Sequence, residues 1–227
     1  MSHVVAIDGP AGAGKSTIAR ALARALGWRY LNTGATYRAL ALMSLTCSTG
    51  TPTEESAARL ADQLTTARYA DAEGRIFMDN QDVTRDLYRP DVERRAALLA
   101  AYPRVREKLV GLQRGLAEQG DCVVEGRDIG SVVFQSATLK IYLTADAETR
   151  ARRRQQALRE KGFEEPLESV RESVIDRDQL DSSRGASPLV KAPDAVEIDT
   201  TRRTPEEILG EIRTELEERL GSRPRTN

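Results

Sequence analysis

The stretch GPAGAGKS, Gly9–Ser16, decides the fold of this chain. It matches the pattern G-x-x-x-x-G-K-[ST] at every fixed position, with a β-branched run before it (4–7) and a helical pattern after it (15–26). Glycines let backbone N–H groups turn inward around phosphate oxygens, and the start of the following helix adds partial positive charge. A chance glycine-rich turn is the alternative, but the matching context favours a phosphate-binding loop.

This loop indicates a nucleoside triphosphate, but it does not name the group that the triphosphate acts on. Lys15 is expected to reach the β- and γ-phosphates, and the Ser16 hydroxyl is expected to bind Mg²⁺. The chain lacks the Asn-Lys-x-Asp motif with which a GTPase reads its base, and motors and large ATPases usually need a longer chain. The predicted triphosphate site comprises Gly9, Pro10, Ala11, Gly12, Ala13, Gly14, Lys15, Ser16 and Thr17.

Composition excludes several classes of protein. The 227 residues include 34 Lys and Arg against 35 Asp and Glu, so no chain-wide basic field exists and no nucleic-acid partner is expected. No apolar run approaches the roughly 20 residues of a membrane helix, and no signal segment opens the chain. We therefore expect a cytoplasmic protein without a membrane partner. It is expected to be a monomer, because no long apolar edge or heptad appears.

Histidine and cysteine chemistry is also disfavoured. His3 is the only histidine, and it lies at the start of the chain, where fraying is expected. Mechanisms of the Ser-His-Asp and Cys-His types, and zinc sites with four Cys or His ligands, are therefore excluded. The two cysteines, Cys47 and Cys122, lie among apolar residues and are interpreted as reduced core thiols.

Short apolar runs alternate with helical periodicities along the chain. This alternation predicts an α/β fold of three layers, in which a central parallel sheet carries helices on both faces. The expected strands are residues 4–7, 30–31, 122–124, 139–143 and 196–198. The expected helices are residues 15–26, 34–46, 146–160 and 167–183, one beginning at Pro90 that Pro103 breaks or kinks, and one that ends the chain.

Two segments carry helix-start signals, and one segment departs from the helical pattern. The segment 51–54 (TPTE) is interpreted as a capping box whose helix runs to about residue 66, and 204–207 (TPEE) as a second box. Residues 67–86 combine short apolar runs with turn signals. They predict a small antiparallel meander inserted among helices.

Polar motifs follow two of the expected strands. Residues 32–38 (NTGATYR) come after the second strand, and residues 125–130 (EGRDIG) come after the strand at 122–124. Ligands of open parallel sheets bind beyond the carboxyl ends of the strands, so both motifs should line one crevice. Arg177, Asp181 and Arg184 are spaced by four and three residues, which places them on one helix face.

Five segments together resemble bacterial cytidylate kinases in order and spacing, from about residue 3 to about 215. They are GPAGAGKST (9–17), NTGATYR (32–38), PRVR (103–106), EGRDIGSVVF (125–134) and RD-x-x-D-S-S-R (177–184). The resemblance implies transfer of the γ-phosphoryl group of ATP to CMP or dCMP with Mg²⁺. It also implies one P-loop kinase domain (1–227), with a nucleoside-monophosphate-binding region that includes the antiparallel insertion (about 33–102) and a lid (about 150–166).

The resemblance also implies roles for individual residues. The expected catalytic residues are Lys15, Arg38, Arg127, Arg150 and Arg153. The residues expected around the acceptor phosphate are Thr33, Tyr37, Arg38 and Arg127. Those expected to read cytosine are Arg106, Asp128 and Arg184, and those expected to hold the sugar are Arg177 and Asp181. Arg154 joins Arg150 and Arg153 on the helix that leads into the lid. One departure is Ala96-Ala97, where the family often has a small hydroxyl residue shortly before PRVR.

The proposed reaction suits a chain without a usable histidine. The attacking atom is a phosphate oxygen whose second pKa is about 6, so it is already ionised at neutral pH and needs no general base. The obstacle is repulsion between two anions, which Lys15, arginines and Mg²⁺ can offset. Each arginine–phosphate contact contributes roughly 1.5–3 kcal/mol, so Arg38→Ala or Arg127→Ala should lower kcat/KM about tenfold or more.

Alternatives remain open at this point. The chain can be another small P-loop kinase with a nucleoside or metabolite acceptor, or a non-catalytic nucleotide-binding module, although aromatic residues make up only 4% and disfavour RNA stacking. Arg152-Arg153-Arg154 can be a solvated helix face, and Arg177 with Asp181 a surface ion pair. Glu125 can support Mg²⁺ through water or be the structural partner of an arginine.

Overall fold

The computed structural model describes residues 2–47, 50–64, 75–78, 80–183 and 188–221. Its centre is a parallel sheet of five strands, as the alternating sequence pattern predicted. The strand order is β2 (Arg29–Asn32), β5 (Cys122–Glu125), β1 (Val4–Asp8), β6 (Leu139–Thr144) and β7 (Val196–Asp199).

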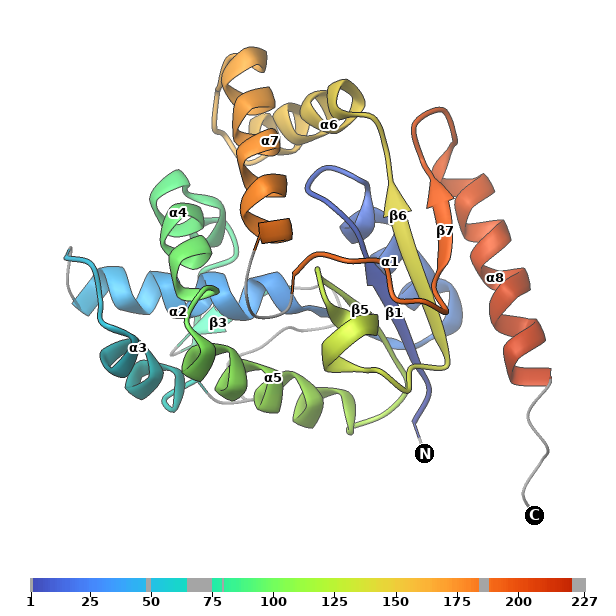
Figure 1. Cartoon of the computed structure of the whole chain (residues 1–227), viewed down its shortest axis with the longest axis horizontal. Coiled ribbons are helices and arrows are strands. Elements are labelled where there is room, and N and C mark those ends of the chain that lie inside the picture. The colour runs from blue at the N-terminus through green and yellow to red at the C-terminus, as the bar shows by residue number, and fades with distance from the viewer. Residues whose placement is uncertain (1, 48–49, 65–74, 79, 184–187, 222–227) are drawn as a thin grey trace.

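Helices cover both faces of this sheet and extend beyond it (Figure 1). They are α1 (Lys15–Leu26), α2 (Thr33–Cys47), α3 (Glu54–Ala61), η2 (Asp86–Tyr88), α4 (Pro90–Leu99), α5 (Pro103–Ala117), η3 (Ile129–Val133), α6 (Ala147–Arg159), α7 (Leu167–Ser183) and α8 (Pro205–Gly221). Pro103 therefore begins a separate helix. In the part of the chain that the structure describes, no helix is long and apolar enough to cross a membrane.

The alternation of side chains along β1 creates the three layers. Val5 and Ile7 point to the face that packs against α1 and α8. Val4 and Ala6 point to the opposite face, where they meet α5 and η3. Both faces of the strand are buried, which is why it reads as a continuous apolar run rather than an alternating one.

A helical arm, formed by α2, α3, η2, α4 and the start of α5, lies to one side of the sheet, and α8 lies on the opposite side (Figure 1). The arm has its own apolar cluster, which includes Leu40, Leu87, Leu99 and Leu109. The short antiparallel pair β3 (Phe77–Met78) and β4 (Gln81–Asp82) belongs to the predicted insertion. The predicted residues 67–74 of that meander fall outside the described part of the chain.

The helices α6 and α7 pack together above the carboxyl ends of the strands (Figure 1). A small cluster of Leu158, Val170 and Val174, with Phe163 against it, joins the two helices. Asp146 caps α6 by accepting a hydrogen bond from the Thr149 N–H (2.7 Å). This pair of helices therefore has a core separate from that of the sheet.

The prediction for the first capping box was wrong about which residue caps the helix and about where the helix ends. Thr53, rather than Thr51, caps α3, because its hydroxyl accepts the Ser56 N–H (3.2 Å), and the helix ends at Ala61. Pro52 lies before the cap rather than inside the helix. The second box is confirmed by two reciprocal bonds between Thr204 and Glu207.

Two expectations about single residues were also wrong. Cys47 is exposed because it ends α2, whereas Cys122 is buried in β5 as predicted. His3 is not frayed: its N–H donates to Asp121 Oδ1 (2.6 Å) and its ring stacks on Trp28.

Candidate active site

The phosphate loop is packed so closely that only glycine fits at two positions. Gly9 has φ 143°, and a Cβ atom there would lie 2.1 Å from the Leu143 carbonyl oxygen. Gly12 has φ 77°, and its Cβ would lie 2.5 Å from the Arg150 carbonyl oxygen. The loop is thus held between β6 and α6, with a backbone geometry that side chains would strain.

Lys15 places a buried ammonium group at the base of this loop. Its Nζ donates to the Pro10 carbonyl oxygen (2.7 Å). Burial, and then the nearby charge of Arg127, lowers the Lys15 pKa from 10.5 to about 7. Among the described residues, no carboxylate forms an ion pair with this buried cation, and an anion in the loop would supply the compensating charge. Ser16 follows Lys15 in the first turn of α1.

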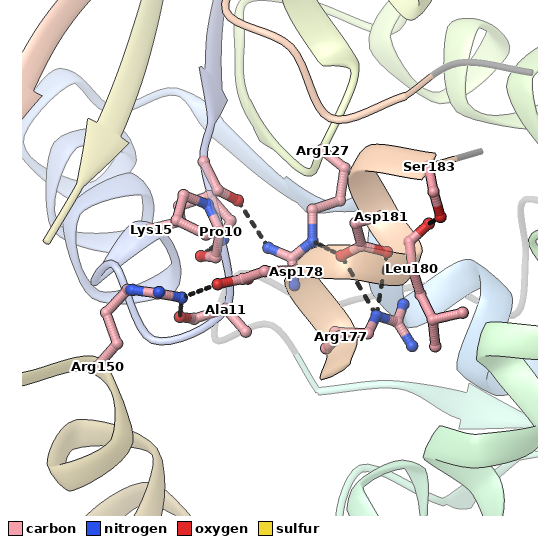
Figure 2. Close-up of polar contacts among 11 residues, drawn as sticks. Pro10, Ala11, Lys15, Arg127, Arg150, Arg177, Asp178, Leu180, Asp181 and Ser183 are labelled. Atoms are coloured by element: carbon pink, nitrogen blue, oxygen red, sulfur yellow. Dashed lines mark hydrogen bonds and ion pairs between the residues drawn. The ribbon is translucent and has the colours of Figure 1, made fainter. Parts of the chain in front are cut away.

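Arg127 connects the phosphate loop to α7 (Figure 2). Its Nη1 donates to the Gly9 carbonyl oxygen (2.7 Å), and its Nε donates to Asp181 Oδ2 (2.7 Å). Asp181 is fully buried and also pairs with Arg177 at 3.1 Å. The Arg177–Asp181 pair is therefore not the solvated surface pair of the alternative interpretation.

Arg150 connects the same loop to the α6–α7 pair. Its Nη1 donates to the Ala11 carbonyl oxygen (3.2 Å) and to Asp178 Oδ2 (2.5 Å), as Figure 2 shows. Asp178 Oδ1 is buried without a hydrogen-bond partner. Asp178 was not singled out in the sequence, although it lies within the RD-x-x-D run.

The three consecutive arginines of α6 have different partners. Arg152 forms an exposed pair with Glu148, so the interpretation as a solvated face is confirmed for this residue. Arg153 turns inward and donates to the Thr200 hydroxyl (2.8 Å) and carbonyl oxygen (2.7 Å). Arg154 forms an ion pair with Glu93 of α4.

The NTGATYR motif begins at Asn32, which ends β2, and its other residues form the start of α2, beside the loop after β5. The Thr33 hydroxyl donates to the Glu125 carbonyl oxygen (2.8 Å), and Tyr37 packs against the apolar cluster of the helical arm. The Arg38 guanidinium lies over the Tyr88 ring, 4.8 Å from its centroid, and its buried Nε has no hydrogen-bond partner. An unsatisfied buried N–H on a cation favours an anionic ligand.

Arg106 and Asp128 form a buried ion pair between α5 and the loop after β5. They were predicted together from separate motifs, and the structure brings them into contact. Their third expected partner, Arg184, lies outside the described residues.

Glu125 ends β5, and among the described residues its side-chain partner is a tyrosine. The Tyr30 hydroxyl donates to Glu125 Oε1 (2.7 Å). Burial, together with this carboxylate, raises the Tyr30 pKa well above its usual value.

Asp8 is a structural anchor of the site that the sequence reasoning missed. Its two carboxylate oxygens accept the N–H groups of Ile129 (2.8 Å) and Gly130 (2.7 Å). These bonds attach the loop that carries Arg127 and Asp128 to the end of β1. An acidic residue directly between a buried strand and the glycine loop was the available signal.

The pH dependence of stability should reveal the buried Asp8 carboxyl. Burial is the main cause that raises its pKa from 3.8 to about 6. The folded chain therefore holds this proton more tightly, so the group stabilises the fold below pH 4, and that contribution is lost as pH rises through about 6.

Urea unfolding of wild type and Asp8→Asn at pH 4 and pH 7 checks this. The free energy of unfolding of the wild type should fall relative to the variant by about 2 kcal/mol over this range. Parallel pH dependence of the two proteins would contradict the assignment.

Comparisons with known proteins identify the family of this chain. A family model described as cytidylate kinase matches residues 5–218. The chain is 48% identical over 208 residues to the cytidylate kinase of Desulfitobacterium hafniense, covering 92% of this chain and 90% of the relative. It is 43% identical over 218 residues to that of Geobacillus kaustophilus, covering 96% and 97%.

A solved structure supports the fold alone. The crystal structure of an uncharacterized protein from Eubacterium ventriosum aligns with a TM-score of 0.50 at 11% identity, covering 97% of this chain and 99% of that chain. The family match over nearly the whole chain and the close relatives show the family itself: this chain belongs to the cytidylate kinases.

Proposed function

We propose that this chain transfers the γ-phosphoryl group of ATP to CMP or dCMP, giving ADP and CDP or dCDP. One observation carries this proposal: three cations from distant parts of the chain, Lys15, Arg127 and Arg150, contact a single phosphate loop. Such a concentration of positive charge suits two phosphate groups that must approach each other.

On the donor side, the loop and its cations hold the triphosphate. The backbone N–H groups of residues 11–16 surround the phosphates, and the Lys15 ammonium neutralises the β- and γ-oxygens. Arg150 and Arg153 approach from α6, beside the position of the transferring group. Arg150 bonds the Ala11 carbonyl oxygen and Asp178, so its guanidinium lies beside the loop.

On the acceptor side, the groups match the chemistry of CMP. Arg38 and Arg127 bind its phosphate, with Thr33 and Tyr37 in support. The Asp128 carboxylate can accept from the amino group of cytosine, while Arg106 donates to its ring acceptors; Arg184 is the third proposed base contact. Arg177 and Asp181 offer a donor and an acceptor to the sugar hydroxyls.

The reaction needs no general base from the protein. A phosphate monoester has a second pKa of about 6, so its oxygen is a ready nucleophile at neutral pH. The chain's task is to align this oxygen with the γ-phosphorus and to offset the combined negative charge. Closure of the lid, residues 150–166, would keep water away from the γ-phosphate.

The donor groups near the loop also fit Mg²⁺. Among the described residues, no group of three or more His, Cys, Asp or Glu side chains could hold a metal ion. Mg²⁺ keeps several waters and binds through few protein ligands plus phosphate oxygens, so the single Ser16 hydroxyl is a sufficient protein ligand. When bound, the ion would supply positive charge that offsets the negative charge of the phosphates. We also infer a monomeric kinase with small-molecule partners, because the sequence carries no long apolar edge or heptad.

An ADP-release assay with Mg²⁺-ATP tests this function. CMP, dCMP, UMP, AMP and GMP are offered in turn, and strong turnover is expected with CMP and dCMP but little with the purines. ATP turnover without acceptor should be low, because water is not the intended nucleophile. Turnover with a metabolite but with no nucleotide would favour another small kinase, and binding of ATP without any turnover would favour a binding module.

A further inference from the structure

Two cations lie over the ring of Tyr88. The Arg38 Cζ atom is 4.8 Å from the ring centroid, and the Lys161 Nζ atom is 4.1 Å from it. Arg38 comes from α2 in the helical arm, whereas Lys161 follows the end of α6. One aromatic ring thus joins the arm to the helix that leads into the lid.

The ring holds Arg38 without using its N–H groups. A cation over an aromatic face is attracted by the ring quadrupole, so its donors stay available to a further ligand. Arg38 Nε is buried with no hydrogen-bond partner, and a Cβ atom on Gly34 would lie 3.1 Å from Arg38 Nη1. The guanidinium is therefore confined by packing while retaining an unsatisfied donor.

Tyr88 itself sits on a well-anchored segment. It ends η2, and its N–H donates to the Arg85 carbonyl oxygen (3.1 Å). The preceding Leu87 is buried in the core of the arm, and Pro90 begins α4 two residues later. The Tyr88 side chain also packs against the apolar cluster of the arm, so the arm contributes to the position of the ring.

Further contacts fasten the end of α6 to the same segment, residues 85–93. Arg85 Nε donates to the Lys161 carbonyl oxygen (3.2 Å), and Arg154 forms an ion pair with Glu93. Gly162 has φ 81°, and a Cβ atom there would lie 2.9 Å from Arg85 Nη2. These contacts between residues 85–93 and α6 with the residues after it therefore hold Lys161 close to the Tyr88 ring.

We propose that Tyr88 is a positioning residue that sets the Arg38 guanidinium for the acceptor phosphate and links it to lid closure through Lys161. This inference rests on the proposed role of Arg38 at that phosphate. Two cations near one ring repel each other, and an anion bound by Arg38 offsets this repulsion. Acceptor binding and seating of the lid at Tyr88 therefore favour each other, as any coupling between two sites must be reciprocal.

Three variants test the role of the ring: Tyr88→Leu removes the aromatic face, Tyr88→Phe keeps it, and Lys161→Met removes the lid cation. Tyr88→Leu should raise the KM for CMP about tenfold and leave the KM for ATP within about twofold. Tyr88→Phe, which keeps the aromatic face, should leave the KM for CMP close to that of the wild type. A merely structural role would alter both KM values, or the melting temperature, together.

A double-mutant comparison tests the link to the lid. Lys161→Met should lower kcat/KM for CMP about threefold in the wild type and have no further effect in Tyr88→Leu. Lys191→Met is the matched control, because Lys191 forms an exposed pair with Glu197 away from the ring. If Tyr88→Leu fails to fold, Lys161→Met is measured in the wild type and in Tyr88→Phe instead. An unchanged kcat/KM for CMP in both backgrounds overturns the link between Tyr88 and the lid.

Arg38→Ala separates this inference from the function on which it rests. If Arg38→Ala raises the KM for CMP but Tyr88→Leu does not, the positioning role is overturned and the proposed function stands. If Arg38→Ala leaves that KM unchanged, the assignment of Arg38 to the acceptor phosphate fails, and the role of Tyr88 fails with it.

Discussion

Replacing Lys15 with methionine is expected to lower kcat for CMP phosphorylation by about a thousandfold or more. This loss corresponds to about 4 kcal/mol of transition-state stabilisation, which a single charge can supply where water is excluded. Lys15 is 8% exposed, so its ammonium acts in such an environment. Methionine fills similar space, but it brings neither the charge nor the donors.

The same substitution should not weaken the fold. Burial lowers the Lys15 pKa to about 7, which means that the folded chain holds the charged form at a cost. Removing that charge should leave the melting temperature unchanged or raise it. Lost activity with retained stability is typical of a residue kept for function.

Lys140→Met provides the matched control for this experiment. Lys140 is also 8% exposed, but it donates to Asp194 and lies outside the phosphate loop. The kcat of the Lys140→Met variant should stay within about threefold of that of the wild type. Steady-state kinetics with saturating Mg²⁺-ATP measure both variants, and a Lys15→Met enzyme within tenfold of wild type would refute the role of Lys15.

Arg127→Ala should lower kcat/KM for CMP about a hundredfold. The substitution removes a proposed phosphate ligand and also both bonds that hold it, to the Gly9 carbonyl oxygen and to Asp181. It leaves the fully buried Asp181 carboxylate with one fewer cation, so the free energy of unfolding should fall by about 2 kcal/mol.

Arg177→Ala distinguishes the catalytic effect of Arg127 from its effect on stability. Arg177 lies one turn before Asp181 on α7 and pairs with the same carboxylate, whereas Arg127 also donates to the Gly9 carbonyl oxygen of the phosphate loop. Its loss should cost similar stability and clearly less kcat/KM. Equal kinetic losses in the two variants, measured well below both melting temperatures, would argue that Arg127 acts only through Asp181.

Sequence reasoning was most successful where structure is decided locally. The phosphate loop and the strands around it were predictable because glycines, apolar runs and helix starts act over a few neighbouring residues. The face shared by Arg177 and Asp181 followed from helical spacing, but the complete burial of Asp181 did not, since burial depends on residues far away in the chain.

Most of what was missed depends on long-range contacts. The two N–H groups that Asp8 accepts lie about 120 residues further along the chain, and Arg153 meets Thr200 at a separation of 47 residues. The short π-helix at Ile129–Val133 was not predicted from its own residues. Its first N–H group, that of Ile129, donates to Asp8, which lies far away in the sequence. At α3 two hydroxyl residues flank Pro52, and composition alone did not decide which one caps the helix.

The different environments of the two cysteines make the native chain suitable for site-specific labelling. Burial raises the Cys122 pKa to about 11, so its thiol stays protonated and unreactive, whereas Cys47 is exposed. A maleimide fluorophore should therefore attach at a single position without any substitution. Cys47 ends the helix that begins with Thr33 and carries Arg38. The dye would thus report on the far end of that helix while ATP and acceptor bind at its beginning.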